Sequence, residues 1–140
     1  MNQVFWARMH GGATHVPIAL LLVSVLFDHA GFWWREGLRR HEFRAFGFYS
    51  LLVAAAASPA AVISGIALSK GVLLGTGMLA LHHYFIWPAF GLLIGLAAWR
   101  LVTRERASRR ARGCYLALAS VTLAAMMSAG YWGGEMLIGR

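Results

Sequence analysis

The sequence predicts an all-α integral membrane protein, a four-helix bundle with both its N-terminus and its C-terminus on the outer side of the membrane. Hydrophobic residues make up 59% of the 140 residues, and the mean hydropathy is +0.61. This is too apolar for a soluble domain that must present a polar surface. The apolar residues gather into four segments, each close to the ~20 residues that an α-helix needs to cross a bilayer. We assign residues 1–140 to a single transmembrane domain.

The sequence marks a start, a kink or an end in each of the four expected helices. They cover residues 15–34, 43–68, 78–102 and 114–138. The first is expected to begin at Thr14 as its cap, with Pro17 in the first turn, where a missing N–H needs no partner. Ser58-Pro59 predicts a kink in the second helix, which neighbouring helices would have to support. Thr76 is a candidate cap in front of the third helix, and the fourth ends in a glycine-rich stretch.

The basic residues predict the orientation of the bundle. The net charge is +8, and ten of the thirteen Lys and Arg residues fall in the first and third loops. They are Arg35, Arg39, Arg40, Arg44, Arg100, Arg104, Arg106, Arg109, Arg110 and Arg112. The C-terminus carries Arg140 alone. The positive-inside rule places both basic loops in the cytoplasm and both termini outside. Because the charge follows membrane topology, we expect membrane lipid as the surroundings and no nucleic acid as a partner.

Four histidines are expected at the outer surface of the membrane. His10 and His15 lie at the start of the first segment, and His82 and His83 lie near the start of the third. Glu135, in the last turn of the fourth segment, is expected at the same surface. Ionisable side chains are costly in a bilayer and usually face the bundle interior, where they bind something or relay protons. Together they indicate one site near the outer surface.

These histidines predict a haem b site. Two facing histidines in a helix bundle can hold a b-type haem, because imidazole nitrogens supply both axial ligands of the iron. His15 would supply one ligand, and either His82 or His83 the other, since adjacent residues on a helix point ~100° apart. His10 would contact a haem propionate or complete a metal site, and Glu135 would tune the haem or take protons from a quinol.

Two other interpretations remain open. The same imidazoles with Glu135 are acceptable ligands for zinc or copper, although no tight HExxH-like spacing supports this. The chain could also be a cofactor-free accessory subunit that packs against a larger membrane complex. Close helix packing is expected at Gly91 and Gly95, whose spacing lets helices approach in lipid.

A polar pair, Asp28 and His29, lies at the inner end of the first segment. His15 and His29 are fourteen residues apart, so they share one helix face about 21 Å apart. That spacing resembles the ligand pairs of two-haem transmembrane cytochromes, in which His41 would provide the inner partner. Otherwise, Asp28 and His29 would support the site or relay protons, or would simply end a helix at the interface.

Two motifs resemble those of DUF2231, a bacterial family of four-helix membrane proteins of unknown function. One is the stretch 10–21 (HGGATHVPIALL) followed by Asp28, and the other is 130–136 (GYWGGEM). The family's histidine near the start of its third helix is matched by His82 or His83. Gly11 stands where the family has proline, and Val16 where it has phenylalanine. The resemblance implies the four-helix fold, and members resemble partners of respiratory or redox proteins.

The sequence therefore predicts a small b-type cytochrome-like subunit of the bacterial cytoplasmic (inner) membrane, with haem near the periplasmic face. It would transfer electrons between membrane quinone and a periplasmic redox partner such as a cytochrome, within a larger redox complex. An electron-transfer or accessory subunit is favoured over a stand-alone enzyme.

Overall fold

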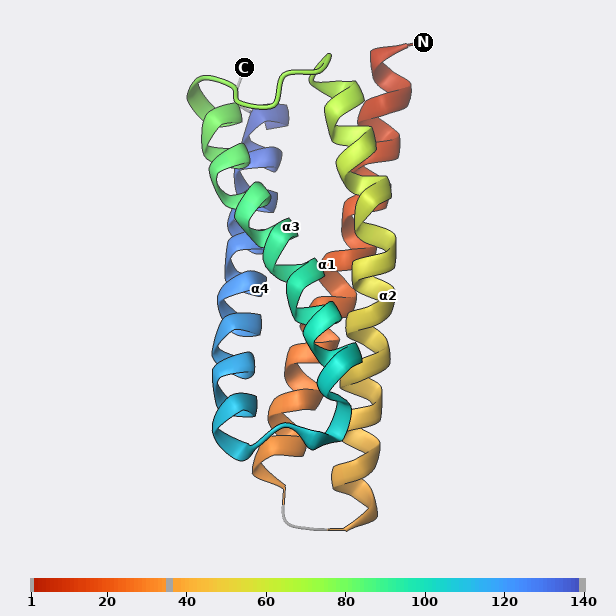
Figure 1. Ribbon diagram of the computed structural model, residues 1–140. Coiled ribbons are helices and arrows are strands. Elements are labelled where there is room, and N and C mark those ends of the chain that lie inside the picture. Colours follow the sequence, from red (N-terminus) through yellow and green to blue (C-terminus); the bar gives the residue numbers. More distant parts are fainter. Residues whose placement is uncertain (1, 35–36, 139–140) are drawn as a thin grey trace.

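Four long helices form the chain in a computed structural model that describes residues 2–34 and 37–138 (Figure 1). They are α1 (Gln3–Trp33), α2 (Leu38–Leu68), α3 (Gly77–Thr103) and α4 (Arg109–Ile138), with a short 3-10 helix, η1 (Arg104–Arg106), before α4. Each long helix is sufficiently long and apolar to cross a membrane. The described residues contain no strand, and the expected all-α four-helix bundle is confirmed. Arg35 and Arg140 of the charge pattern lie outside the described residues.

The helices run alternately up and down, so the start of α1, the end of α4 and the α2–α3 loop lie at one end of the bundle (Figure 1). We call this end the histidine end, because His10 and His82 lie there. The other end, which carries the α1–α2 connection and η1, is the arginine end. The side of the membrane that each end faces remains a prediction from the positive-inside rule.

Helix α1 begins at Gln3 rather than near His15, because Asn2 caps it. The Asn2 side chain accepts a hydrogen bond from the Val4 N–H at 3.1 Å. The helix then continues through Gly11-Gly12. The apolar segment marks where the chain crosses hydrocarbon, whereas helical hydrogen bonding continues into polar turns. For the same reason α2 and α4 also begin before their predicted starts.

Thr14 and Pro17 therefore lie inside α1 and do not mark its start. The Thr14 hydroxyl donates to the Gly11 carbonyl oxygen at 3.0 Å, within the helix. Pro17 is fully buried in mid-helix. A proline at such a position removes one helical hydrogen bond, which transmembrane helices tolerate when neighbouring helices pack around it. Thr76 does lie at the N-cap of α3, but its side chain makes no capping hydrogen bond.

Pro59 does not interrupt α2. A proline lacks the N–H that would bond the carbonyl four residues earlier, which here belongs to Ala55. The Ser58 hydroxyl donates to the Ala55 oxygen at 2.8 Å instead. This bond satisfies the orphaned carbonyl, and α2 runs continuously over 31 residues.

The bundle consists of two helix pairs. α1 packs mainly on α2 and α3 mainly on α4, with fewer contacts between the pairs. Leu21 of α1, Leu51 of α2 and Leu93 of α3 are fully buried at the centre. α3 leans from α4 at the histidine end toward α2 at the arginine end, so the two pairs diverge toward the histidine end (Figure 1).

Candidate cofactor site

His10 lies on the face of α1 that contacts α2. Its Nδ1 is 3.0 Å from the Ala61 carbonyl oxygen and 3.3 Å from the Ser64 hydroxyl. A Cβ atom at Gly65 would lie only 2.9 Å from the imidazole Cε1, so the ring occupies the space that glycine leaves open. α2 thereby holds the His10 ring in one orientation.

His82 of α3 is held in the same way by its own partner helix, α4. Its Nδ1 lies 2.8 Å from the Ala129 carbonyl oxygen. A Cβ atom at Gly133 would touch the same ring at 3.4 Å, so α4 approaches it closely. The glycine-rich end of α4 thus lies directly against this histidine.

The His10 and His82 rings approach one another edge to face, each from a different helix pair. Their centroids are 6.3 Å apart, and their planes meet at 79°. A carbonyl oxygen can only accept a hydrogen bond, so each Nδ1 donates its proton to that oxygen, and Nε2 is the ring nitrogen left for another partner. A metal-binding histidine shows the same pattern, donating its second ring N–H to a carbonyl or carboxylate. The arrangement thus presents two oriented imidazole rings from opposite halves of the bundle.

His83 is the most buried histidine of this group. It is 7% exposed, and its Nδ1 is buried without a hydrogen-bond partner among the described residues. Its ring centroid lies 5.6 Å from that of His82 and 5.9 Å from that of Trp87. Buried polar atoms are normally satisfied by protein, ligand or water. The His83 nitrogen is therefore a polar group that a bound molecule could use.

An apolar pocket lies beside these three histidines, between the helix pairs. Its enclosed space is about 60 Å³, and about 610 Å³ with its open mouth included. The polar side chains of its wall are His10, Thr14, Ser58, His82 and His83. Its larger apolar side chains are Ile18, Val62, Ile66, Ile86, Trp87, Phe90 and Met126. An apolar wall with a few converging nitrogen ligands suits a hydrophobic cofactor with a metal centre.

His15 and Glu135 do not join this arrangement. His15 is exposed on α1, where its Nδ1 donates to the Gly11 carbonyl oxygen of its own helix. Glu135 is half-buried and makes no hydrogen bond or ion pair with any described residue. Across residues 2–34 and 37–138, no three His, Cys, Asp or Glu residues are grouped so as to hold a metal ion. The structure thus brings together His10, His82 and His83, and it does not bring the expected ligand His15 to them.

The continuous α1 explains why His10 replaces His15 at the pocket. Five positions apart on one helix, the two side chains point about 140° away from each other. With His10 directed at α2 and α3, His15 must point outward. A helix that began at Thr14, as the apolar run predicts, would leave His10 outside it and hide this relationship. Extending the helix back through Gly11-Gly12 would have revealed it.

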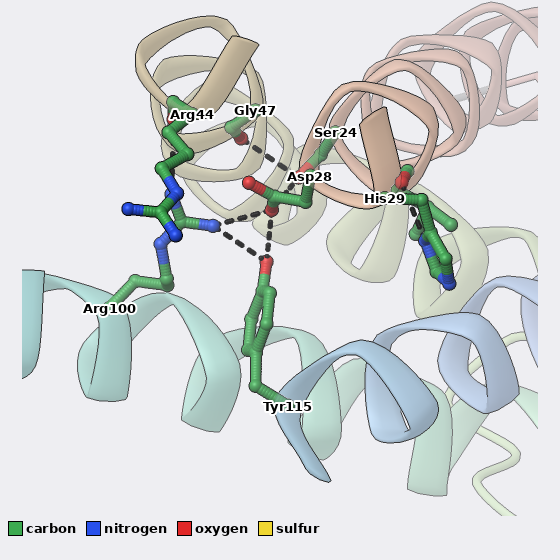
Figure 2. A network of polar contacts seen from close by, with 8 residues as sticks. Ser24, Asp28, His29, Arg44, Gly47, Arg100 and Tyr115 are labelled. Carbon is green, nitrogen blue, oxygen red and sulfur yellow. Dashed lines mark hydrogen bonds and ion pairs between the residues drawn. The ribbon is translucent and has the colours of Figure 1, made fainter. Parts of the chain in front are cut away.

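The predicted inner residue Asp28 belongs to a separate buried network at the arginine end (Figure 2). Its Oδ2 accepts hydrogen bonds from Arg100 Nη1 at 2.5 Å and from the Tyr115 hydroxyl at 2.7 Å. Arg100 Nη1 also lies 3.2 Å from the Tyr115 oxygen, and Arg100 Nη2 donates to the Arg44 carbonyl oxygen at 3.1 Å. The network links α1 to the other three helices.

Arg100 and Tyr115 were missed as partners of Asp28. The charge pattern groups Arg100 with the basic loop, although Arg100 follows Trp99 inside the third apolar segment. An intramembrane arginine usually pairs with a carboxylate or a backbone carbonyl. That rule, applied to Arg100, could have identified the pair.

His29 contributes neither to this network nor to the histidine pocket. Figure 2 shows its ring pointing away from Asp28, and its Nδ1 lies 2.9 Å from the Val25 carbonyl oxygen of its own helix. His41, its expected partner for a second haem, is exposed on α2. Asp28 supports a helix contact through Arg100, at the opposite end of the bundle from His10 and His82.

Four apolar helices with a paired-imidazole pocket at one end define a multi-pass membrane protein with a candidate cofactor site. The chain belongs to the DUF2231 family, whose model, described as a predicted membrane protein, matches residues 8–139. Comparisons with the curated proteins and with the solved structures find no match. The expected family is confirmed, and its description names the membrane and no activity.

Proposed function

We propose that the chain is a haem b-binding electron-transfer subunit whose axial ligands are His10 and His82. The observation that carries this proposal is the approach of two imidazoles from different helix pairs, with their centroids 6.3 Å apart. Two Nε2 ligands on opposite sides of one metal, each at about 2.0 Å, would separate the ring centroids by roughly 6 Å. Each ring also donates its Nδ1–H to a backbone carbonyl, as haem and metal ligands commonly do.

Haem is favoured over zinc because of the number of ligands that the protein offers. A porphyrin supplies four nitrogens of its own, so two histidines complete the iron's coordination, whereas a zinc site needs three or four protein ligands. The pocket wall beside the histidines is apolar and includes Trp87 and Phe90, which suits a porphyrin. His83 would lie beside the cofactor and could donate to it.

Copper is an alternative to haem iron, and the position of Met126 supports it. Met126 is buried in the wall of the same pocket. Thioether and imidazole ligands together suit Cu(I). Copper bound without haem would therefore use His10, His82 and the Met126 sulfur.

The position of the site favours electron transfer. The pocket lies at the histidine end of the bundle, near one membrane surface, where a quinone in the lipid and a redox protein outside could both approach. We place the chain in the bacterial cytoplasmic membrane with this end facing the periplasm, following the positive-inside rule. Its partners would be a periplasmic cytochrome or other subunits of a redox complex.

The test is a dithionite-reduced minus oxidised absorption spectrum of the gently purified chain, with a pyridine haemochrome count. We expect b-type bands with one haem per chain. His10→Ala and His82→Ala should abolish them, whereas His15→Ala, which removes an exposed histidine of the same helix, should not. Loss of haem in His15→Ala alone would instead support the ligand pair predicted from the sequence. A flat spectrum with stoichiometric copper would replace haem by the copper site.

A cofactor-free accessory subunit is the second candidate, and the outer face of α3 supports it. Gly91 and Gly95 are exposed, and a Cβ atom at either would have no neighbour within 4 Å. These glycines therefore pack against no other helix of this chain, and a helix of another subunit could approach them closely. Under this proposal Gly91→Leu should reduce the size of the complex in mild detergent, and His10→Ala should not.

A further inference from the structure

A pocket at the arginine end is lined by guanidinium groups from distant parts of the chain. Its space is about 390 Å³ with its open mouth included. Its wall is formed by Phe32, Arg40, Arg44, Ala107, Arg109 and Arg112. The fold thus gathers two arginines from the start of α2 and two from the start of α4 around one space. The haem proposal uses none of these residues.

Named contacts hold these side chains around the pocket. The Arg109 guanidinium lies over the Phe32 ring at 4.9 Å from its centroid, a cation–π contact. Arg112 Nε donates to the Ala107 carbonyl oxygen at 3.1 Å. A Cβ atom at Gly31 would lie 2.9 Å from Arg44 Cγ, so α1 and α2 meet closely behind Arg44. These contacts restrict the orientation of the arginine side chains in the pocket wall.

The arginine end keeps a net positive charge even when its carboxylates are ionised. The two basic loops contain ten arginines, and Asp28 pairs with Arg100. The glutamates of the same stretches are Glu36, Glu42 and Glu105. With all four carboxylates ionised, the ten arginines still give this end an excess of positive charge, which attracts anions to it.

We propose that this pocket binds the phosphate group of an anionic phospholipid. Guanidinium groups match phosphate with two parallel hydrogen bonds, and basic pockets between transmembrane helices bind anionic headgroups. Phe32 places an aromatic ring next to the arginines, and Trp33 beside it is 72% exposed, as expected at a lipid interface. The acyl chains would then lie along the apolar surface of the bundle, which a free phosphate ion could not use.

The first test is thermal unfolding of the full chain in detergent with three additives. We expect phosphatidylglycerol to raise the Tm, and phosphatidylcholine and inorganic phosphate at equal concentration to leave it unchanged. No rise with phosphatidylglycerol would overturn the proposal, as would an equal rise with phosphatidylcholine. A rise with inorganic phosphate alone would also overturn it, because the site would then recognise a free anion.

Two double variants test the location. Arg40→Gln/Arg109→Gln removes two charges from the pocket wall, and Arg106→Gln/Arg110→Gln removes two exposed charges from the same end outside it. Both variants lose the same diffuse attraction, about fivefold in affinity for each arginine near an anionic lipid surface. The pocket variant also loses direct hydrogen bonds from guanidinium to phosphate, so it should bind phosphatidylglycerol at least about tenfold more weakly than the control. Equal losses in both variants would show a diffuse charge effect and reject the pocket.

Native mass spectrometry of the unmodified chain tests lipid binding without relying on a variant that must fold. One phosphatidylglycerol molecule should stay bound at collision energies that remove phosphatidylcholine. Equal release of the two lipids would contradict the proposal.

Discussion

Arg100 of α3 and Asp28 of α1 form an ion pair, with Arg100 Nη1 2.5 Å from Asp28 Oδ2 and the two side chains 8% and 5% exposed. The pair joins the two helix pairs at the arginine end, where Figure 1 shows α3 leaning toward α2. The Arg100 guanidinium also lies 5.5 Å from the centre of the Phe48 ring. Each charge of this buried pair is compensated by the other. Removing one member therefore leaves the other buried and uncompensated.

We expect Asp28→Ala and Arg100→Ala each to lower the free energy of unfolding by about 3–5 kcal/mol, the usual effect of breaking a buried pair. The double variant Asp28→Ala/Arg100→Ala should cost clearly less than the sum of the two, because it leaves no unpaired charge. Circular dichroism during titration with a denaturing detergent measures all three. Additive losses would show that the two residues act independently.

Tyr115→Phe should lower the free energy of unfolding by about 1.5–3 kcal/mol, since it removes a hydrogen bond to a carboxylate. The hydroxyl lies 2.7 Å from Asp28 Oδ2, and the ring stacks on Trp99 at 5.3 Å. The ring remains in the variant, so only the hydroxyl contact is tested. Tyr131→Phe is the control, because Tyr131 is 61% exposed on the same helix. Equal effects of the two variants in the detergent titration would contradict this role of Tyr115.

Gly47→Ala should destabilise the bundle by about 1–3 kcal/mol, as overpacking of a core does. An added Cβ atom would lie 2.6 Å from Asp28 Cγ, inside the ion-pair network. Gly95→Ala is the matched control, because a Cβ atom there would meet nothing within 4 Å. It should be neutral or slightly stabilising, since alanine favours a helix by about 1 kcal/mol over glycine. The same melting temperature for both variants would be evidence against the close contact.

Gly65→Ala should reduce cofactor binding without removing a ligand. An added Cβ atom would lie 2.9 Å from His10 Cε1 and would push the ring away from Ala61 and His82. We expect less haem per chain, or altered haem bands, together with unchanged helix content. The haemochrome count and circular dichroism of one preparation measure both. Unaltered haem in Gly65→Ala, together with haem loss in His10→Ala, would show that His10 tolerates displacement.

The sequence predicted the helix count and the segments that cross the membrane, because these depend on local apolar runs. It did not predict the helix starts, since hydrogen bonding continues into the polar turns around Asn2 and Gly11. It also identified His10, His82 and His83 as candidate site residues, and chose His15 over His10 as the ligand. That choice depended on which face of α1 meets the other helices, a property that hydropathy does not encode.

By itself, the sequence determined that this is a four-helix membrane protein of the DUF2231 family with one basic end and one histidine-bearing end. Charge and hydropathy are properties of local segments, so they can be summed residue by residue from the sequence. Only the tertiary structure decided that His10 approaches His82, that Arg100 pairs with Asp28, and that arginines of α2 and α4 line one pocket. These contacts join residues from different helices, and their geometry depends on how each helix is rotated and on where glycine lets a neighbouring side chain approach.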